Sequence, residues 1–375
     1  MGEYQYYEFL AIDGPISDEG LAYAKECSSR AEVSRFRWLN TYNYGDFHGS
    51  EEKLLKYYDA YFYIANWGTM LLGLAFPNGC LNPDLLPPYF RGGKRYENSL
   101  SVTRVDDRCI VWWSRNDDEG WGWTEGEGII NELVGIREEI MCGDYRALFL
   151  GWLADFDPEE WLDSGKTKAK IPPIPSNLGT LSASLSALIE QFPVDGDALA
   201  VAVALSRSVS AARTPIATVI DNLSESEMRA LLQRVGQGDG AKVMSELNRL
   251  TYPTPEKSTT PRMTCTEFAV RALKVREERL KKEAAAAEAE RKRKEEERRQ
   301  HLASVRRRAN IIWASLHPLM DQKIASAYDE VAAQLRDLRD AYKQSQETDS
   351  FQKRLETFSK RYARRPAMIR RIEEL

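Results

Sequence analysis

Residues 281–300 read KKEAAAAEAERKRKEEERRQ, with no large aliphatic or aromatic residue that a core could bury. Alanine has the highest helix propensity, and opposite charges four positions apart stabilise a helix by about 0.2–0.5 kcal/mol per pair. A helix that is polar on all sides bridges packed elements through solvent. We therefore expect this segment, here called the stalk, to be a solvent-exposed helix. The spacing predicts five ion pairs: Glu288 with Lys292, Glu290 with Lys294, Arg291 with Glu295, Arg293 with Glu297, and Glu295 with Arg299.

Apolar residues at helical spacing return on the C-terminal side of the stalk. Ile311, Ile312, Trp313 and Leu316 precede Pro318, and two further amphipathic stripes cover residues 324–342 and 351–362. This spacing predicts a small helical bundle. A helix continuous from about 264 to 316 would be roughly 80 Å long at 1.5 Å per residue.

The opposite end of the chain has the pattern of an α+β domain. Aromatic and β-branched runs predict strands at 4–12, 33–44, 60–65, 70–76, 100–105 and 108–113, and helices are expected at 17–28 and from residue 50. The expected fold is a mixed or antiparallel sheet with helices, for which a ferredoxin-like or related open sandwich fits.

Helical patterns dominate between the two ends. They cover residues 129–141, 144–154, 179–192, 196–212 and 224–250, with a proline-rich extended linker at 166–178. The glycine-rich residues 236–240 are expected to break the last of these helices into two. Ser224 and Glu227 have the spacing of a capping box. We therefore expect an α+β domain at 1–128, an all-helical domain at 129–252, a linker at 253–263, and a C-terminal arm at 264–375 with a long charged helix and a terminal bundle.

Charge is distributed unevenly over the 375 residues, whose net charge is −5. Residues 261–375 hold 28 Lys and Arg against 19 Asp and Glu, a net of +9, whereas residues 1–260 hold 24 against 38, a net of −14. Such asymmetry favours one of two interpretations. The arm complements the acidic remainder of the chain, or it meets an acidic partner such as nucleic acid.

Composition argues against several classes of protein. The five cysteines are scattered without a Cys-x-x-Cys pair, and there are three histidines, so a disulfide framework, a zinc module and a histidine-rich metal centre are not expected. No apolar run reaches the roughly 18–20 residues that span a bilayer, and the N-terminus lacks an apolar signal core. We expect a cytoplasmic protein with no membrane contact, no metal and no cofactor.

Two loops of the expected α+β domain combine polar and aromatic groups. Asp46 and His48, in loop 42–49, could act as an acid/base pair, or they could belong to a strand-to-helix turn. Asn66 and Trp67 could present an amide and an indole to a ligand, or Trp67 could be a buried residue at a strand bend. The sequence alone does not distinguish between the two interpretations of either loop.

Two further sets of residues are candidate contact sites. Trp121 and Trp123, in an acidic segment, suit a cationic ligand or a basic partner, although the simpler interpretation is a solvated surface loop. Two basic clusters are candidates for contacts with nucleic-acid phosphates. The alternative is a solvated stalk whose positive charge is balanced by the three glutamates at 295–297. The members of the two clusters are Arg291, Lys292, Arg293 and Lys294, and Arg306, Arg307 and Arg308.

Several motifs carry a resemblance to a known family. They are Tyr-Tyr-Glu-Phe-x-Ala-Ile-Asp at 6–13, Tyr-Gly-Asp-Phe-x-Gly at 44–49, Ala-Asn-Trp-Gly-Thr at 65–69 and Tyr-Ala-Arg-Arg-Pro-Ala at 362–367. Together they resemble an uncharacterised bacterial protein family. The resemblance reaches both ends of the chain and implies a bacterial origin and a soluble protein, but it brings no activity and no catalytic residue.

Three functional hypotheses follow from these observations. The leading one is a non-enzymatic adaptor, whose head binds a protein partner and whose charged helical arm spaces or docks a second surface. The first alternative is a nucleic-acid-associated protein that uses the basic arm. The second is an enzyme with a cleft formed by the loops 42–49 and 63–69.

Overall fold

The computed structural model describes residues 3–77, 80–81, 86–91, 99–117, 120, 124–165, 168–209, 214–252 and 262–373. The chain forms two compact units, Met1–Glu277 and Glu278–Leu375. We call the first the head and the second the C-terminal unit. The boundary between them falls inside one helix, α12 (Cys265–Arg307).

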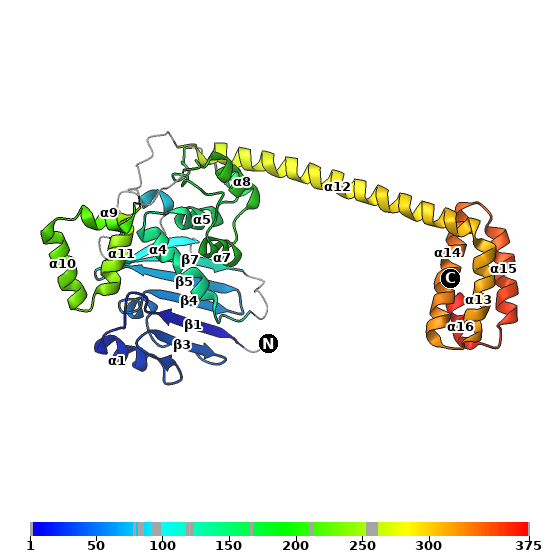
Figure 1. Ribbon diagram of the computed structural model, residues 1–375, viewed down its shortest axis with the longest axis horizontal. Helices are drawn as coiled ribbons and strands as arrows, with labels where there is room; N and C mark the ends of the chain where they lie inside the picture. The colour runs from blue at the N-terminus through cyan, green and yellow to red at the C-terminus, as the bar shows by residue number, and fades with distance from the viewer. Residues whose placement is uncertain are drawn as a thin grey trace. The chain divides into compact units, whose positions relative to one another are not determined.

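In the described part of the head, seven strands form one sheet in the order β2-β3-β1-β4-β5-β7-β6, with every pairing antiparallel (Figure 1). The α+β class is therefore confirmed, and of the two expected sheet types the antiparallel one is present. The strand expected at 33–44 is divided into β2 and β3. The strands are β1 (Gln5–Leu10), β2 (Glu32–Val33), β3 (Arg37–Tyr42), β4 (Ala60–Ala65), β5 (Thr69–Phe76), β6 (Leu100–Val105) and β7 (Arg108–Asn116).

Each face of the sheet has its own hydrophobic core. Successive side chains of a strand point to opposite faces, so the neighbours Trp112 and Trp113 belong to different cores. The Trp112 face packs with α1 (Asp18–Glu26) and α2 (Glu51–Leu54). The Trp113 face packs with a layer of helices (Figure 1). These are α3 (Ile129–Leu133), α4 (Gly135–Met141), α5 (Arg146–Ala154), α7 (Ala183–Gln191) and α8 (Gly196–Leu205).

This second core changes the domain division expected from the sequence. It joins strand residues to α3, α4, α5, α7 and α8 and also to Phe268 at the start of α12, so residues 129–205 do not form a separate core. The proline-rich stretch expected to be a linker is packed as well. Ile171 is buried, its N–H donates to the carbonyl of Met263 at 3.1 Å, and the N–H of Cys265 donates to the carbonyl of Ala169 at 2.8 Å.

Three short helices form a less buried part of the head: α9 (Ile216–Asp221), α10 (Glu225–Gly236) and α11 (Gly240–Leu250). The capping box at the start of α10 is confirmed, because the Ser224 side chain accepts from the Glu227 N–H and the Glu227 carboxylate accepts from the Ser224 N–H. The expected break of the 224–250 helix at residues 236–240 is also confirmed, because α10 ends at Gly236 and α11 begins at Gly240. The head also contains η1 (Pro87–Tyr89) and α6 (Pro158–Asp163).

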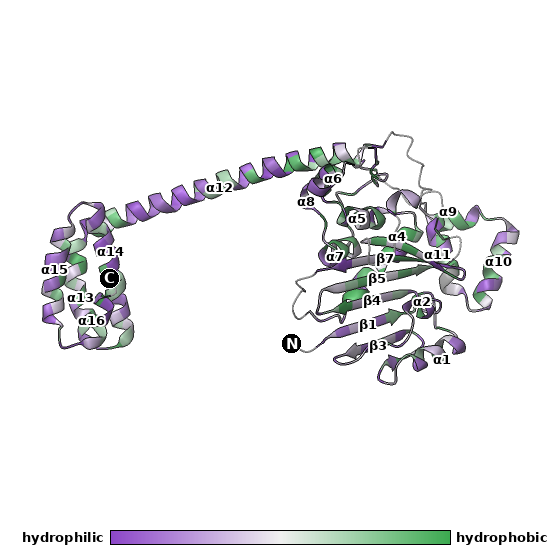
Figure 2. Cartoon of the chain, turned by 180° about the vertical axis from the view of Figure 1, so that it is seen from behind, coloured by the Kyte–Doolittle hydropathy of each residue, from purple (hydrophilic) through white to green (hydrophobic). Residues whose placement is uncertain are grey.

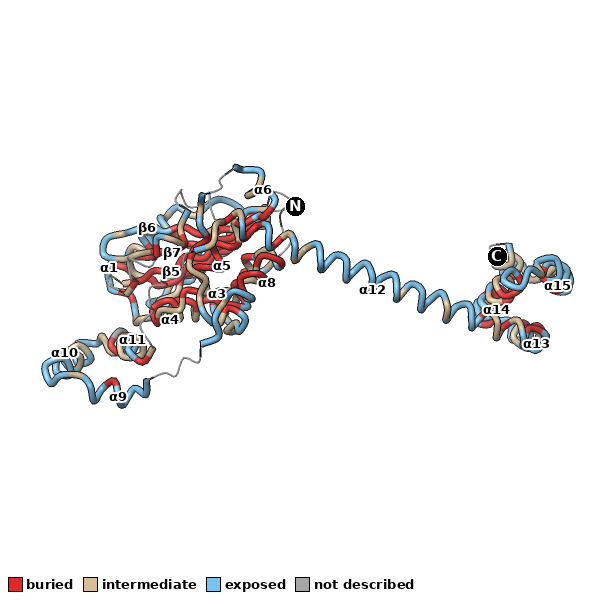
Figure 3. The backbone as a smooth tube through the Cα atoms, turned by 90° about the horizontal axis from the view of Figure 1, so that it is seen from above, coloured by how far each residue is buried: buried red, intermediate tan, exposed pale blue. Residues whose placement is uncertain are grey.

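The stalk is a helix whose side chains face solvent. Residues 281–300 lie within α12, and all of them are exposed except Glu290 and Glu296, which are half-buried (Figure 3). Four of the five expected ion pairs form, while Arg299 pairs with Glu296 at 2.8 Å instead of with Glu295. The four are Glu288 with Lys292 at 2.6 Å, Glu290 with Lys294 at 3.5 Å, Arg291 with Glu295 at 3.6 Å, and Arg293 with Glu297 at 3.6 Å.

The long helix ends earlier than the sequence suggests. Arg308 leaves helical geometry at φ −97° and ψ 9°, and a new helix, α13 (Ala309–Asp321), begins directly after it. Pro318, expected to end a helix, lies inside α13. Proline removes the hydrogen bond to the carbonyl four residues earlier, which here belongs to the exposed Ala314, where water can replace the missing donor.

The expected C-terminal bundle is present. The end of α12 packs with α13, α14 (Ala325–Gln344), α15 (Thr348–Arg361) and α16 (Pro366–Glu373) around one core. Trp313 and Leu316 are buried there, as expected, but Ile311 is 70% exposed. Because α13 starts at Ala309, Ile311 falls on the outer side of the helix, while Trp313, Leu316 and Met320 share the inner side.

Candidate functional site

The two loops singled out in the sequence lie at the same end of the sheet. Gln5 on β1 pairs with Tyr42 at the end of β3 and with Ala65 at the end of β4. The Gln5 amide donates to the carbonyl of Gly45 and to a carboxylate oxygen of Asp46, both at 3.3 Å. The Tyr7 hydroxyl donates to the Gln5 side-chain oxygen at 2.8 Å. Gln5 therefore attaches loop 42–49 to the sheet.

The candidate residues of these loops have structural contacts. Asp46 accepts from Gln5, while His48 is exposed. The Asn66 side-chain oxygen accepts from the Tyr4 N–H at 3.2 Å, which extends the pairing of β1 with β4 by one residue. Trp67 is 46% exposed, so the interpretation of a buried indole is wrong. These contacts hold the loops in place and assemble no acid/base pair from Asp46 and His48.

The β4–β5 turn that carries Trp67 depends on a glycine. Gly68 has φ +101°, and a Cβ placed on it would lie 1.8 Å from the carbonyl oxygen of Asp117. The main chain of residue 117 also donates its N–H to the carbonyl of Gly68 at 2.8 Å. Trp121 and Trp123, the other aromatic candidates of this region, lie outside the described residues.

The stalk cluster at 291–294 is neutralised along the helix. Each of its four cations lies within 4 Å of a glutamate carboxylate of α12. Arg306 pairs with Glu347, and its guanidinium lies 4.3 Å from the ring centre of Tyr342. Arg307 and Arg308 are exposed. Of the predicted phosphate contacts, Arg307 and Arg308 therefore present their charge most directly to solvent.

A buried cluster of four charged residues at the other end of the sheet was not expected from the sequence. It consists of Asp13 after β1, Asp59 before β4, Arg108 at the start of β7, and Arg137 in α4. Arg137 is 1% exposed and Asp59 is 3% exposed. Charges this deep are stable only when they are paired and hydrogen-bonded.

Arg137 is the centre of the cluster. Its Nη1 and Nη2 donate to the two carboxylate oxygens of Asp13 at 2.8 and 2.6 Å, and its Nε donates to the carbonyl of Ala75 at 2.7 Å. Burial on its own would lower the pKa of the Arg137 guanidinium. The hydrogen bonds to Asp13 and the negative charge of Asp59 outweigh burial, so the pKa is raised. Arg137 is therefore held in its charged form.

Asp59 connects Arg137 to the rest of the head. One of its carboxylate oxygens accepts from Arg108 and lies 3.6 Å from Nη2 of Arg137, while the other accepts from the N–H groups of Ile12 and Asp13 at 2.6 and 2.9 Å. Arg108 also donates to the carbonyls of Leu55 and Tyr58 at 2.9 and 2.8 Å. The cluster thus ties α4, β7 and the segment after β1 together, which is a structural role.

A cavity of about 360 Å³ lies beside this cluster. Asp13 and Arg137 form one side of it, and Met244 and Asn248 of α11 form another. Ile12, Val134 and Glu138 complete its lining. Two of its polar lining residues, Asp13 and Arg137, are paired with each other.

Several apolar side chains of α9–α11 are exposed. On α10, Met228, Leu232 and Val235 follow at helical spacing, and Leu232 is 71% exposed. Further exposed apolar residues lie on the neighbouring helices, and Figure 2 shows hydrophobic positions interspersed along α10. We call the stripe of Met228, Leu232 and Val235 on α10 the apolar face; the other exposed apolar residues of α9–α11 are Ile216, Ile220, Met244 and Leu250.

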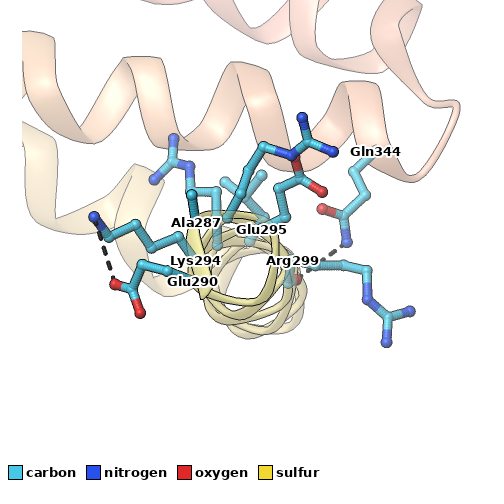
Figure 4. Close-up of a pocket in the computed structure, with 9 residues that line it drawn as sticks. Ala287, Glu290, Lys294, Glu295, Arg299 and Gln344 are labelled. Atoms are coloured by element: carbon cyan, nitrogen blue, oxygen red, sulfur yellow. Dashed lines mark hydrogen bonds and ion pairs between the residues drawn. The ribbon is translucent and has the colours of Figure 1, made fainter. Parts of the chain in front are cut away.

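The C-terminal unit has a shallow groove of about 680 Å³ between α12 and α14 (Figure 4). Its lining on α12 carries four cations, Arg291, Lys294, Arg298 and Arg299, and two carboxylates, Glu290 and Glu295. Ala287 and Leu302 are the first and last lining residues along α12, and Gln344 of α14 donates to the carbonyl of Arg299 at 3.2 Å. The groove therefore combines both signs of charge with one apolar residue toward each end.

No protein-family model, curated protein or solved structure matches this chain. The resemblance of its motifs to a bacterial family therefore stays a prediction. Among the described helices, none combines the length and hydrophobicity that crossing a bilayer requires. Within the described residues, no group of three or more His, Cys, Asp and Glu side chains is placed to hold a metal ion.

Proposed function

We propose that this chain is a non-enzymatic adaptor whose head binds a partner protein through the apolar face. The observation that carries the proposal is the stripe of Met228, Leu232 and Val235 on α10, a helix with no buried residue among those described. Contiguous apolar residues on a surface mark sites of protein association. A stripe spaced four and three residues apart suits a helix that enters an apolar groove of a partner.

The C-terminal unit supplies the second part of the proposal. The bundle has a core of its own, and the exposed stalk, which belongs to the same unit, precedes the bundle in the sequence. The stalk buries no apolar surface, so its sequence contributes reach and solubility instead of core packing. In an adaptor, such a unit would space or dock a second surface.

The proposal is tested by affinity capture from the native host after nuclease treatment. Wild type is compared with Leu232→Glu and with the control Gln233→Glu. Both variants add one negative charge at adjacent exposed positions of α10, but only Leu232→Glu changes the apolar stripe. We expect a protein partner that wild type and Gln233→Glu retain and that Leu232→Glu loses. Equal retention by all three would contradict binding through this face.

A second candidate function is association with nucleic acid through the arm, supported by the exposed Arg307 and Arg308. Phosphate binding releases counterions, so affinity should fall steeply with salt. The ion pairs within residues 288–297 argue for a smaller contribution from the stalk cluster. Binding that disappears with nuclease and with Arg307→Gln/Arg308→Gln would favour this candidate over the adaptor.

A further inference from the structure

We propose that two copies of this chain associate through the α12 groove, with their two α12 helices antiparallel. The two-fold axis would pass between Lys294 and Glu295. In such a pair, residues equally distant from the centre face each other, and each contact occurs twice. The proposal concerns the C-terminal unit alone and does not depend on what the head binds.

The charges of the groove are complementary to themselves under this symmetry. Lys294 of one copy faces Glu295 of the other, and Glu290 faces Arg299. At the two ends, Ala287 faces Leu302, which puts a small apolar residue opposite a large one. Opposite charges across a helix pair set its orientation and register. A parallel arrangement would instead place each residue opposite its own copy and so oppose like charges.

One pair of positions brings like charges together, namely Arg291 and Arg298. Arg298 is already held by two carboxylates of α14, with Asp337 at 2.7 Å and Asp340 at 2.9 Å. Its charge is therefore compensated before a second copy arrives. Arg291 of the second copy therefore meets an arginine that is already ion-paired, so the repulsion between the two guanidinium groups is smaller than between two unpaired charges at the same distance.

Two ion pairs within α12 line the groove and are exposed to solvent. Lys294 lies 3.5 Å from Glu290, and Arg291 lies 3.6 Å from Glu295. Figure 4 shows Lys294 and Glu290 side by side on α12, joined by this ion pair. Because exposed ion pairs contribute little to stability, a second copy can replace them with little loss.

Exposed ion pairs contribute little each and are screened by salt. We therefore expect a weak dimer that dissociates as ionic strength rises. Sedimentation velocity of the full chain, over a range of protein concentrations at low and at high salt, measures this directly. Wild type is expected to be dimeric at high concentration and low salt, and monomeric at high salt.

Charge reversal identifies the interface. Lys294→Glu creates two repulsions with Glu295 and should raise the dissociation constant about tenfold or more. The double variant Lys294→Glu/Glu295→Lys restores opposite charges across the axis and should restore the dimer. Lys292→Glu makes the same charge change outside the groove and should leave association unchanged.

Three outcomes would overturn the proposal. If wild type stays monomeric at every concentration, two copies do not associate through the groove. A dimer that Lys294→Glu does not weaken uses a different surface. A dimer that Lys292→Glu weakens as much as Lys294→Glu depends on net charge and not on the pairing of Lys294 with Glu295.

Discussion

Replacing Arg137 with methionine should destabilise the head far more than replacing an exposed arginine. Methionine keeps much of the side-chain length and loses the charge and all donors. The substitution removes two hydrogen bonds to Asp13 and one to the carbonyl of Ala75. It also takes from the Asp13 carboxylate the guanidinium that pairs with it, in a site where the Asp13 side chain is only 14% exposed.

The size of the effect follows from this burial. Removing one partner of a buried ion pair costs about 3–5 kcal/mol. Asp59 keeps Arg108 and two backbone N–H donors, so the loss should lie near the lower end, about 3 kcal/mol. With a urea dependence of about 3 kcal/mol per molar, the midpoint of unfolding should fall by about 1 M.

Urea unfolding followed by tryptophan fluorescence measures this change. Of the nine tryptophans, only Trp313 lies in the C-terminal unit, so Trp313→Phe in every variant makes the signal report on the head. Arg104→Met, on the exposed side of β6, is the control and should change stability by less than about 0.5 kcal/mol.

A double variant tests the cause. Arg137→Met/Asp13→Leu removes the Asp13 carboxylate together with the arginine that pairs with it and should recover part of the lost stability. A loss below about 1 kcal/mol for Arg137→Met would refute the reasoning. The reasoning would also be refuted if Asp13→Leu lowered the free energy of unfolding of Arg137→Met as much as an independent substitution does.

Two further predictions concern pH and helix capping. Burial lowers the pKa of His317 and the positive charge of Arg361 lowers it further, so just below the unfolded pKa of about 6.5 the unfolded chain binds more protons than the folded one. The stability that the neutral His317 contributes is complete above that pH and is lost as the pH falls below it. His317→Gln should remove this acid-induced loss, measured by thermal unfolding of the C-terminal unit at about pH 7.5 and about pH 5.5. A variant with the same pH dependence as wild type would contradict the assignment. Ser224→Ala should destabilise α10 by about 1 kcal/mol through loss of the capping box, seen as faster amide exchange in α10; exchange equal to that of wild type would show that the cap contributes nothing.

Local signals in the sequence predicted the local elements well. The capping box at Ser224 formed, because both partners lie within one turn and need nothing from the rest of the chain. The runs that became β4 and β5 were recognisable because strands covered on both faces are apolar throughout. The stalk was predictable for the opposite reason, since a segment without large apolar residues has no core to join.

The buried ion cluster could not be assembled from the sequence, because its four residues come from four separate segments. One signal was available, however. Arg137 occupies a core-facing position, seven residues after Ile130 and three before Ile140, both of which are buried. A charged residue at such a position predicts a buried partner, although spacing along one helix cannot identify Asp13 or Asp59 as that partner.

The end of α12 was also beyond local reasoning. Nothing in the sequence near Arg308 breaks a helix, while Pro318 should. The structure does the reverse, because the chain must turn at residue 308 to bring Trp313, Leu316 and Met320 into the bundle core. The groove that the stalk lines also depends on this packing, because Gln344 of α14 is one of its lining residues.

The most direct test of the account is amide hydrogen exchange of residues 281–297 in the intact chain. A helix held by alanine propensity and exposed ion pairs should show weak but measurable protection, well below that of β4, β5 and the bundle core. Protection should weaken further as salt screens the pairs. Protection as strong as that of the core would mean that the stalk is packed against other parts of the protein, and no protection would mean that it is not a helix; either result would contradict a solvent-exposed helical stalk.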